Sequence, residues 1–459
     1  MQATIPSDQS GRAPIAILGV PFDGVSLAET LALAGEMIAS AQPHYVTTVG
    51  VDFLVQSLED VELRRILFDA HLVLAEEKAV VRASKMLGNP LPENVTVPNL
   101  IPQLLTLAEQ KQWRVFLLGG GEGAAEKIRA RHPQLQLVGV HIPPEKPLLE
   151  MDNSDILHRL RQAKPDILLV AFGSPKQEKW INMNYREAGV PFVLGTGSTF
   201  DFLTGVGTPR RGGAKILWKF VTAVARQRLR LRGTKSAPPT TKAEITPDPL
   251  GNFIIRAPER LGAAEAQVFL PEWLRTVEGG PVLFDLSDTK FTDSTGIGAL
   301  IRLRKRAREL GQHFFLVAAR PPVEAVLRMM KLDEFFNMQM SVAGARILME
   351  SLAHVPVVTS GMQASELQIR WSGEVTALNA VELGVHTESE LSQTEPGMTV
   401  VIDLARVTFV DSTGIGLMLR FKKNLQRRNI NLKFANPTAS VRNVLKHTRL
   451  DEYLLDGTK

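Results

Sequence analysis

Cysteine is absent from the 459 residues of this chain, and its absence excludes two kinds of structure. Neither a disulfide framework nor a zinc site with thiolate ligands can form. The nine histidines show no spacing typical of metal ligands, so we expect no metal site. No apolar run approaches the roughly 18 residues that cross a bilayer, and the N-terminal segment lacks the pattern of a signal peptide. We therefore expect a soluble, cytoplasmic chain.

Acidic residues are missing from one stretch, Thr208–Ser236, which holds nine lysines and arginines. The chain has a net charge of +5, and without these nine cations its charge would be −4. Basicity this local favours one anionic partner surface over general nucleic-acid binding. We expect no nucleic-acid partner.

A helix starting at Lys215 would separate basic from apolar side chains. The basic side would consist of Lys215, Lys219, Arg226 and Arg230, and the apolar side of Ile216, Phe220, Val221, Val224 and Leu231. Such a helix can lie in a membrane interface, where each cation near anionic lipid adds about 1 kcal/mol. The alternative is a helix packed on its own domain, or on a neighbouring subunit of a homo-oligomer.

Apolar runs bounded by turn residues alternate with helical patterns through the first half of the chain. The expected strands are Ile15–Val20, Tyr45–Thr48, Leu72–Leu74, Val115–Leu118, Ile167–Phe172 and Phe192–Leu194. This alternation predicts an α/β domain with a Rossmann-like, doubly wound parallel sheet. Ligands of such sheets bind at the carboxyl ends of the strands, where Gln177, Glu178 and Asp201 stand.

Glycines follow the strand at Val115–Leu118, in the run Gly119-Gly120-Gly121-Glu122-Gly123 before a predicted helix. Glycine lets the backbone approach a phosphate, whose charge a helix N-terminus favours. The spacing is not that of the dinucleotide fingerprint GxGxxG. A phosphate-binding loop and a tight structural turn both remain open.

Four segments, in this order, resemble the WecG/TagA/CpsF family of bacterial glycosyltransferases, glycosyltransferase family 26. They are ILGVPFD (Ile17–Asp23), LLGGGEG (Leu117–Gly123), PDILLVAFGSPKQEKWI (Pro165–Ile181) and GTGSTFDFLTG (Gly195–Gly205). The resemblance extends from Ala16 to about Arg232, and Pro-Lys-Gln-Glu followed by Trp180 is its most specific part. By itself, Trp180 is more typical of a core residue than of a sugar platform.

The resemblance implies an inverting transfer of a sugar from a UDP-sugar to a lipid-linked acceptor, in cell-surface polysaccharide synthesis. The sugar would be of the N-acetylmannosamine, glucose or a related type. No metal cofactor is implied, and the chain indeed lacks the Asp-x-Asp motif of many other glycosyltransferases. Because the implied acceptor is membrane-bound, we favour membrane contact for the basic helix, which would place the protein peripherally at the inner face of the bacterial cytoplasmic membrane.

Site residues follow from the same resemblance. Glu76 falls at the position of the family's general base, which is normally an aspartate. The implied donor-binding residues are Thr48, Gly119, Gly120, Gly121, Gln177 and Asp201. The asparagine expected after Thr48 is Gly50, and an arginine and a glycine expected further along fall on Asn94 and Val97.

Simpler interpretations exist for these residues. Glu76 could be a solvated acid at a strand end. Gln177 and Glu178 could cap a helix after Pro175, because Ser-Pro-x-x-Glu resembles a capping box, and Asp201 could cap the next helix.

Beyond a Pro/Thr/Ser-rich linker at 233–243, the sequence repeats itself. Phe284–Gly311 matches Ile402–Asn429, at an offset of 118 residues that also relates Ser294 to Ser412. Each copy predicts a strand, an Asp-Ser-Thr-Gly turn, an amphipathic helix and a further strand. We expect domains at 1–232, 244–352 and 366–459.

Both copies resemble STAS domains, the smaller α/β fold of sulfate transporters and anti-sigma-factor antagonists. The resemblance implies phosphorylation of Ser294 and Ser412, and a serine kinase or phosphatase or an anti-sigma-type protein as partner. The alternative for Asp293-Ser294 and Asp411-Ser412 is plain N-capping of a helix.

Together these observations predict a glycosyltransferase regulated through two STAS domains. The alternative is a catalytically degenerate domain that binds a nucleotide sugar or serves as a scaffold, while the STAS domains switch partners according to phosphorylation.

Overall fold

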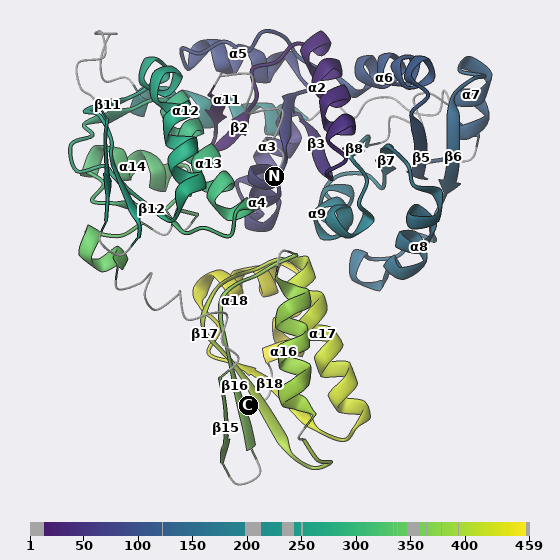
Figure 1. Ribbon diagram of the computed structural model, residues 1–459, viewed down its shortest axis with the longest axis vertical. Helices are drawn as coiled ribbons and strands as arrows, with labels where there is room; N and C mark the ends of the chain where they lie inside the picture. Colours follow the sequence, from purple (N-terminus) through teal and green to yellow (C-terminus); the bar gives the residue numbers. More distant parts are fainter. Residues whose placement is uncertain are drawn as a thin grey trace.

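Three domains make up this computed structural model (Figure 1). The residues described are 13–121, 123–197, 213–231, 243–248, 251–333, 335–336, 338–346, 359–363, 366–377, 379–392 and 394–455. We name the N-terminal domain (13–231), the middle domain (243–346) and the C-terminal domain (359–455). Figure 1 shows the first two side by side, with the C-terminal domain below both. None of the helices in the described ranges is long and apolar enough to cross a membrane.

A six-stranded parallel sheet, in the order β4-β3-β8-β7-β5-β6, forms the centre of the N-terminal domain. Its strands are β3 (His44–Val49), β4 (Leu72–Ala75), β5 (Arg114–Gly119), β6 (Gln136–His141), β7 (Ile167–Ala171) and β8 (Phe192–Gly195). Five strands are almost entirely buried, while β6, at the edge, is half-exposed. This confirms the predicted α/β fold.

Helices cover both faces of this sheet. On one face pack α3 (Val51–Ser57), α4 (Val61–Asp69), α5 (Lys78–Met86), α8 (Asn153–Ala163), α9 (Lys176–Ala188) and α11 (Ala214–Leu231). On the other pack α2 (Leu27–Ser40), α6 (Val97–Lys111) and α7 (Ala124–Arg131). Side chains of β7 alternate between the two cores: Leu168 and Val170 face the first, and Ile167 and Leu169 the second. The continuous apolar run of β7 is therefore explained by burial on both faces.

The first predicted strand is wrong in its extent and partner. Ile15–Val20 does not form one strand of the main sheet but an antiparallel hairpin of β1 (Ile15–Ile17) and β2 (Val20–Phe22). The turn at Leu18-Gly19 has φ values of 51° and 85°, a left-handed conformation that glycine adopts easily. The strand β6 was not predicted.

The middle and C-terminal domains are smaller α/β units, each built around a four-stranded sheet. The middle domain contains β9 (Glu244–Pro247), β10 (Phe253–Arg256), β11 (Arg260–Leu261), α12 (Ala263–Gly279), β12 (Val282–Asp285), β13 (Phe291–Thr292), α13 (Ser294–Glu309), β14 (Phe314–Val317) and α14 (Pro321–Met329). The C-terminal domain contains β15 (Thr359–Gln363), β16 (Glu366–Val375), α16 (Ala380–Leu391), β17 (Thr399–Val410), α17 (Ser412–Arg427), β18 (Asn431–Ala435), α18 (Ala439–His447) and α19 (Asp451–Leu455).

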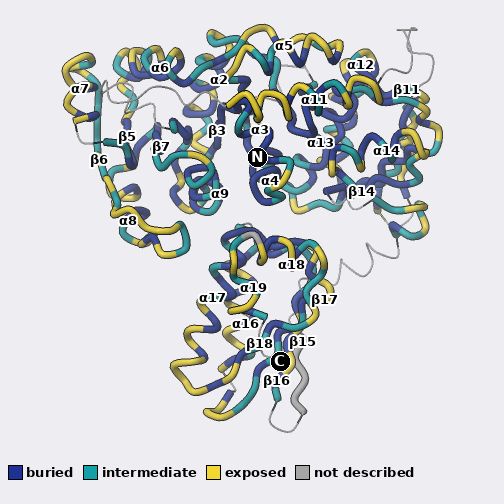
Figure 2. Tube along the Cα trace, turned by 180° about the vertical axis from the view of Figure 1, so that it is seen from behind, coloured by how far each residue is buried: buried dark blue, intermediate teal, exposed yellow. Residues whose placement is uncertain are grey.

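The N-terminal and middle domains share apolar packing. Ala16 and Phe68 belong to the core of the middle domain, and the Phe68 and Phe335 ring centroids are 4.2 Å apart. A Cβ atom on Gly298 would lie 1.9 Å from the carbonyl oxygen of Pro14, so this helix position requires glycine. In Figure 2, α4 and α13 are largely buried segments. The two domains therefore form one packed body.

Candidate active site

Most of the predicted site residues lie at the carboxyl ends of five neighbouring strands. Strands β7 and β5 are adjacent, yet the helices that follow them, α9 and α7, pack on opposite faces of the sheet. Open α/β sheets bind their ligands at such a reversal. The loops that begin at Gly119 and Gly173 flank this point, and β8, β3 and β4 end along the same edge.

Thr48 and Glu76 stand at the ends of β3 and β4. The Thr48 hydroxyl donates a long hydrogen bond of 3.5 Å to Glu76 Oε2. Burial, with the neighbouring carboxylate of Glu77, raises the pKa of Glu76. A carboxylate with a raised pKa is the stronger proton acceptor, which suits a general base.

The adjacent acid, Glu77, makes a different contact. Glu77 is exposed, and its Oε1 accepts a 3.0 Å hydrogen bond from the backbone N–H of Val51 in the first turn of α3. Asn94, at the position of the expected arginine, donates to the Glu76 carbonyl oxygen at 3.1 Å. Val97, where the resemblance expects glycine, is buried at the start of α6. Of the two neighbouring acids, Glu76 is thus the one directed toward Thr48.

Gln177 joins α9 to the loop after β8. Its Oε1 accepts from the backbone N–H of Gly197 at 2.9 Å, and its Nε2 donates to Glu178 Oε1 at 2.7 Å. A Cβ atom on Gly195 would lie 2.8 Å from Gln177 Nε2, so this glycine makes room for the amide. The N-cap of α9 is Pro175, which makes no side-chain cap, so the capping interpretation of Gln177 and Glu178 is wrong. A contact of Gln177 with a donor sugar stays a prediction.

Sequence reasoning placed Glu178 at the ligand-binding edge of the sheet but gave it no specific role in catalysis or binding. It is 2% exposed, and its Oε2 is buried without a hydrogen-bond partner among the described residues. Burial raises its pKa to about 7, against the opposing effect of the Gln177 and Ser174 side chains, and the nearby Glu76 adds to the rise. A buried acceptor without a partner costs about 1–3 kcal/mol, and its position in the first turn of α9 makes Glu178 a candidate functional residue. The position of Glu178 in the Pro-Lys-Gln-Glu run could have identified it as a site residue from the sequence.

The glycine loop serves the contact between β5 and β7. Gly119 has φ of 83°, and a Cβ atom there would lie 2.7 Å from the carbonyl oxygen of Ala171. The Gly120 N–H donates to this same oxygen at 3.2 Å. These facts favour the tight structural turn, and a phosphate contact at Gly119, Gly120 or Gly121 stays a prediction. Asp201 lies outside the described residues.

Most of the apolar side of α11 is not a free surface, so this part of the membrane prediction is wrong. The exception is Val221, which is 46% exposed. Phe220 and Val224 are buried in the N-terminal core, with Ile216 and Leu231 packed against it. The Gln227 side chain, also buried, bonds the Ala16 carbonyl oxygen at 2.8 Å and the Leu18 N–H at 2.9 Å. The helix thus packs on its own domain.

The outer side of α11 is nevertheless both basic and apolar. Lys215, Lys219, Arg226 and Arg230 are all exposed. Between them lie Leu217, Trp218 and Leu229, and Trp218 is 70% exposed. An exposed tryptophan among cations suits a membrane interface, and the sequence did not indicate that Trp218 lies on the basic side of the helix.

The two candidate phosphorylation sites are both covered. Ser294 is fully buried, and the next residue, Thr295, accepts a hydrogen bond from Asn89 of the N-terminal domain. The Ser412 N–H donates to Glu62 Oε1 of α4 at 2.5 Å, and Ser412 is 4% exposed. The aspartate before each serine caps the helix, as the simpler interpretation expects. Phosphorylation of either serine stays a prediction.

No group of three or more His, Asp or Glu side chains that could hold a metal occurs within the described ranges. The expectation of a metal-free site stays a prediction.

Comparison with known protein families decides the identity of the domains. The profile of the glycosyl transferase WecG/TagA/CpsF family matches residues 15–231, and that of the STAS domain matches 241–345 and 357–458. The N-terminal domain belongs to the WecG/TagA/CpsF glycosyltransferase family. The middle and C-terminal domains are STAS domains.

Curated relatives of the WecG/TagA/CpsF domain are enzymes. One is the N-acetylglucosaminyldiphosphoundecaprenol N-acetyl-beta-D-mannosaminyltransferase of Staphylococcus aureus strain MRSA252, 24% identical over 204 residues, which cover 43% of this chain and 78% of the relative. The same enzyme from strain NCTC 8325 / PS 47 is 23% identical over the same shares. The family and these relatives make the N-terminal domain a glycosyltransferase domain.

Solved structures similar to this chain include two STAS proteins. The anti-sigma factor antagonist SpoIIAA in its unphosphorylated form is 23% identical and covers 22% of this chain and 90% of its own, with a TM-score of 0.20. A STAS domain protein from Planctomyces limnophilus is 26% identical and covers 23% and 95%, with a TM-score of 0.21.

Proposed function

We propose that the chain transfers a sugar from a UDP-sugar to a lipid-linked acceptor in cell-surface polysaccharide synthesis, with inversion and without a metal. The named activity of the Staphylococcus aureus relatives, which act on a lipid diphosphate, supports this acceptor class. The donor is a UDP-sugar of the N-acetylmannosamine, glucose or a related type. The observation that carries the proposal is the pairing of Glu76 with Thr48 beside Glu178 at one edge of the sheet.

Glu76 acts as the general base that removes the proton from the acceptor hydroxyl. Its raised pKa makes it a better acceptor, and Thr48 orients the carboxylate. Gln177 and the loops after β5 and β8, with Asp201, bind the donor. Glu178 holds a proton near neutral pH and donates a hydrogen bond to the donor through Oε2, the oxygen that does not bond Gln177.

The outer side of α11 brings the site to the acceptor. Lys215, Lys219, Arg226 and Arg230 contact anionic headgroups, and Trp218 enters the interface. The protein thereby acts peripherally at the inner face of the bacterial cytoplasmic membrane. The STAS domains place the transferase activity under the control of a serine kinase or phosphatase, or of an anti-sigma-type protein.

The full chain provides the test. Calorimetry with UDP and a panel of UDP-sugars measures donor binding, and UDP release with a lipid-linked acceptor analogue measures transfer. Binding with release supports the enzyme, whereas release without acceptor dependence contradicts the acceptor class.

A second candidate is a degenerate domain that binds a nucleotide sugar without turnover. Asn94 favours it, because its amide bonds the backbone of Glu76 where an arginine would contact a diphosphate. Donor binding with no UDP release from any acceptor analogue would support this candidate.

A further inference from the structure

The C-terminal domain meets the N-terminal domain through a carboxylate placed at a helix end. Glu62 of α4 is 3% exposed, and its Oε1 accepts from the first N–H of α17, that of Ser412, at 2.5 Å. Its Oε2 lies 2.8 Å from Lys179 Nζ on α9. Helix N-termini attract anions, so one domain supplies the anion that the helix of the other domain requires.

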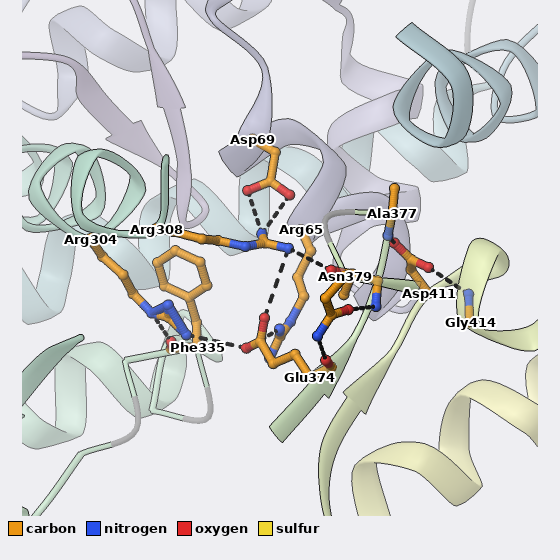
Figure 3. Close-up of polar contacts among 11 residues, drawn as sticks. Arg65, Asp69, Arg304, Arg308, Phe335, Glu374, Ala377, Asn379, Asp411 and Gly414 are labelled. Carbon is orange, nitrogen blue, oxygen red and sulfur yellow. Dashed lines mark hydrogen bonds and ion pairs between the residues drawn. The ribbon is translucent and has the colours of Figure 1, made fainter. Parts of the chain in front are cut away.

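A second carboxylate joins all three domains (Figure 3). Glu374 of β16 lies 2.6 Å from Arg65 of α4 and 3.3 Å from Arg304 of α13. Arg308, also on α13, lies 3.8 Å from Glu374 and bonds both oxygens of Asp69 at 2.6 Å. Burial alone would raise the pKa of Glu374, but the three guanidinium groups lower it, so the carboxylate stays charged.

The two STAS copies are held differently. The middle domain shares an apolar core with the N-terminal domain through Ala16 and Phe68. The C-terminal domain is held chiefly by the Glu62 and Glu374 contacts, with the Arg65 guanidinium stacked 3.7 Å from the Phe409 ring centroid. Its apolar contact with the N-terminal domain is smaller: Val61 and Leu149, both only partly buried, pack against the edge of its core. Polar interfaces between domains permit relative motion, whereas a shared core does not.

A cavity of about 800 Å³ lies between the middle and C-terminal domains, next to the Glu374 contacts. Its lining includes Gln312 and His313 on one side and Gly373 and Thr408 on the other. The two domains are therefore not closely packed there, and the Glu374 contacts would not have to break a continuous core to open.

We propose that the α4–α9 face of the transferase domain, formed by Glu62, Arg65 and Lys179, is a docking surface for the Ser412 end of the C-terminal STAS domain, which detaches and rejoins as the regulatory copy. The middle STAS domain is the structural copy. The regulatory part of this inference rests on the proposed function, because α9 begins with the site residues Gln177 and Glu178. In the docked state α17 lies against α9, so docking restrains α9, and detachment removes this contact.

Negative charge at Ser412 opposes docking. Glu62 already occupies the anion position at the start of α17, and Asp411 caps the same turn. Burial, with the facing Glu62, raises the pKa of Asp411 to about 7, and Arg308 opposes this shift. A further anion on Ser412 would meet two carboxylates, so it would expel the domain.

Distance measurements on the full chain test the docking. Because the chain has no cysteine, Lys111→Cys and Lys423→Cys introduce one spin label on α6 and one on α17. We expect a narrow distance distribution in this parent protein, a broader and longer one with Glu374→Lys or Ser412→Asp, and no change with Glu382→Lys on the exposed face of α16. A distribution that is broad in the parent, or that stays narrow in both test variants, overturns the proposal. Ser412→Asp keeps the test valid if Glu374→Lys fails to fold.

Hydrogen exchange tests the connection to the site. In the absence of ligand, the Lys176–Ala188 peptide should exchange about tenfold faster in Ser412→Asp than in the Glu382→Lys control. Equal rates overturn the connection. Both readouts need no donor and no turnover. A protein that binds no UDP but still responds to Ser412→Asp contradicts the proposed function alone.

Discussion

The hydroxyl of Thr48 lies 3.5 Å from the carboxylate of Glu76, across the ends of two neighbouring strands. The carboxylate is half-buried, and its other neighbour is the acidic side chain of Glu77. A base in this position is oriented by a neutral donor, so it keeps its capacity to take a proton.

Replacement of Glu76 by Gln should lower transfer by about 100-fold or more, the usual contribution of a general base. Donor binding should change little, because the amide preserves size and hydrogen bonding. UDP release and calorimetry on the same preparation separate these effects. Glu77→Gln is the matched control, since it keeps an acceptor for the Val51 N–H and should retain most of the activity, because burial, the larger cause of the raised Glu76 pKa, is unchanged. Full turnover by Glu76→Gln would remove Glu76 as the base.

Replacement of Gly195 by Ala should weaken UDP-sugar binding about tenfold, an effect of about 1.4 kcal/mol. The new methyl group would lie 2.8 Å from Gln177 Nε2 and would push the amide away from the Gly197 N–H. Calorimetry measures the loss. Gly416→Ala in α17 is the control, because nothing lies within 4 Å of its Cβ position. Unchanged affinity in Gly195→Ala would separate Gln177 from donor binding.

The free energy of unfolding should fall as the pH rises from 4.5 to 7, because of Glu178. Its pKa rises from 4.5 to about 7 on folding, so in this range the folded chain holds a proton that the unfolded chain has lost. Across this range the free energy of unfolding should fall by about 3 kcal/mol. Thermal unfolding at pH 5 and pH 7.5 should show a smaller difference for Glu178→Gln than for the wild type. The exposed Glu126→Gln should behave like the wild type, and an identical pH dependence in Glu178→Gln would contradict the burial argument.

Charge reversal on α11 should release the protein from anionic vesicles. The triple change Lys215→Glu, Lys219→Glu and Arg226→Glu removes three favourable contacts, each of about 1 kcal/mol, and adds repulsion. Sedimentation with vesicles containing phosphatidylserine measures binding. Trp218→Ala should weaken it as well, whereas Phe220→Ala should chiefly lower stability, because Phe220 is buried. Unchanged sedimentation of the triple variant would refute the membrane contact.

The sequence allowed the main sheet to be predicted because β7 and β8 are buried on both faces, which leaves apolar runs with clear ends. The strand β6 lies at an edge and is half-exposed, so its residues carry no such pattern. The N-terminal hairpin reads as a single strand until Gly19 is recognised as a left-handed turn residue.

The site was predictable where a motif marks it and not where domains meet. Glu76 and Thr48 are brought together as adjacent strand ends require. The amphipathic pattern of α11 was real, but periodicity alone does not tell whether a core or a lipid covers the apolar side. Glu62 and Glu374 carry no local signal, because their partners are up to 350 residues away in the chain.

The contact of Gly298 with Pro14 has a consequence for any attempt to produce the domains separately. The helix α13 meets the backbone of the N-terminal domain at this glycine, and the surrounding apolar side chains are buried only while both domains are present. If the chain were cut at the linker, each half would expose an apolar patch around Ala16, Phe68 and Phe335, and would be prone to aggregate. We therefore expect neither of the first two domains to remain soluble when it is produced without the other.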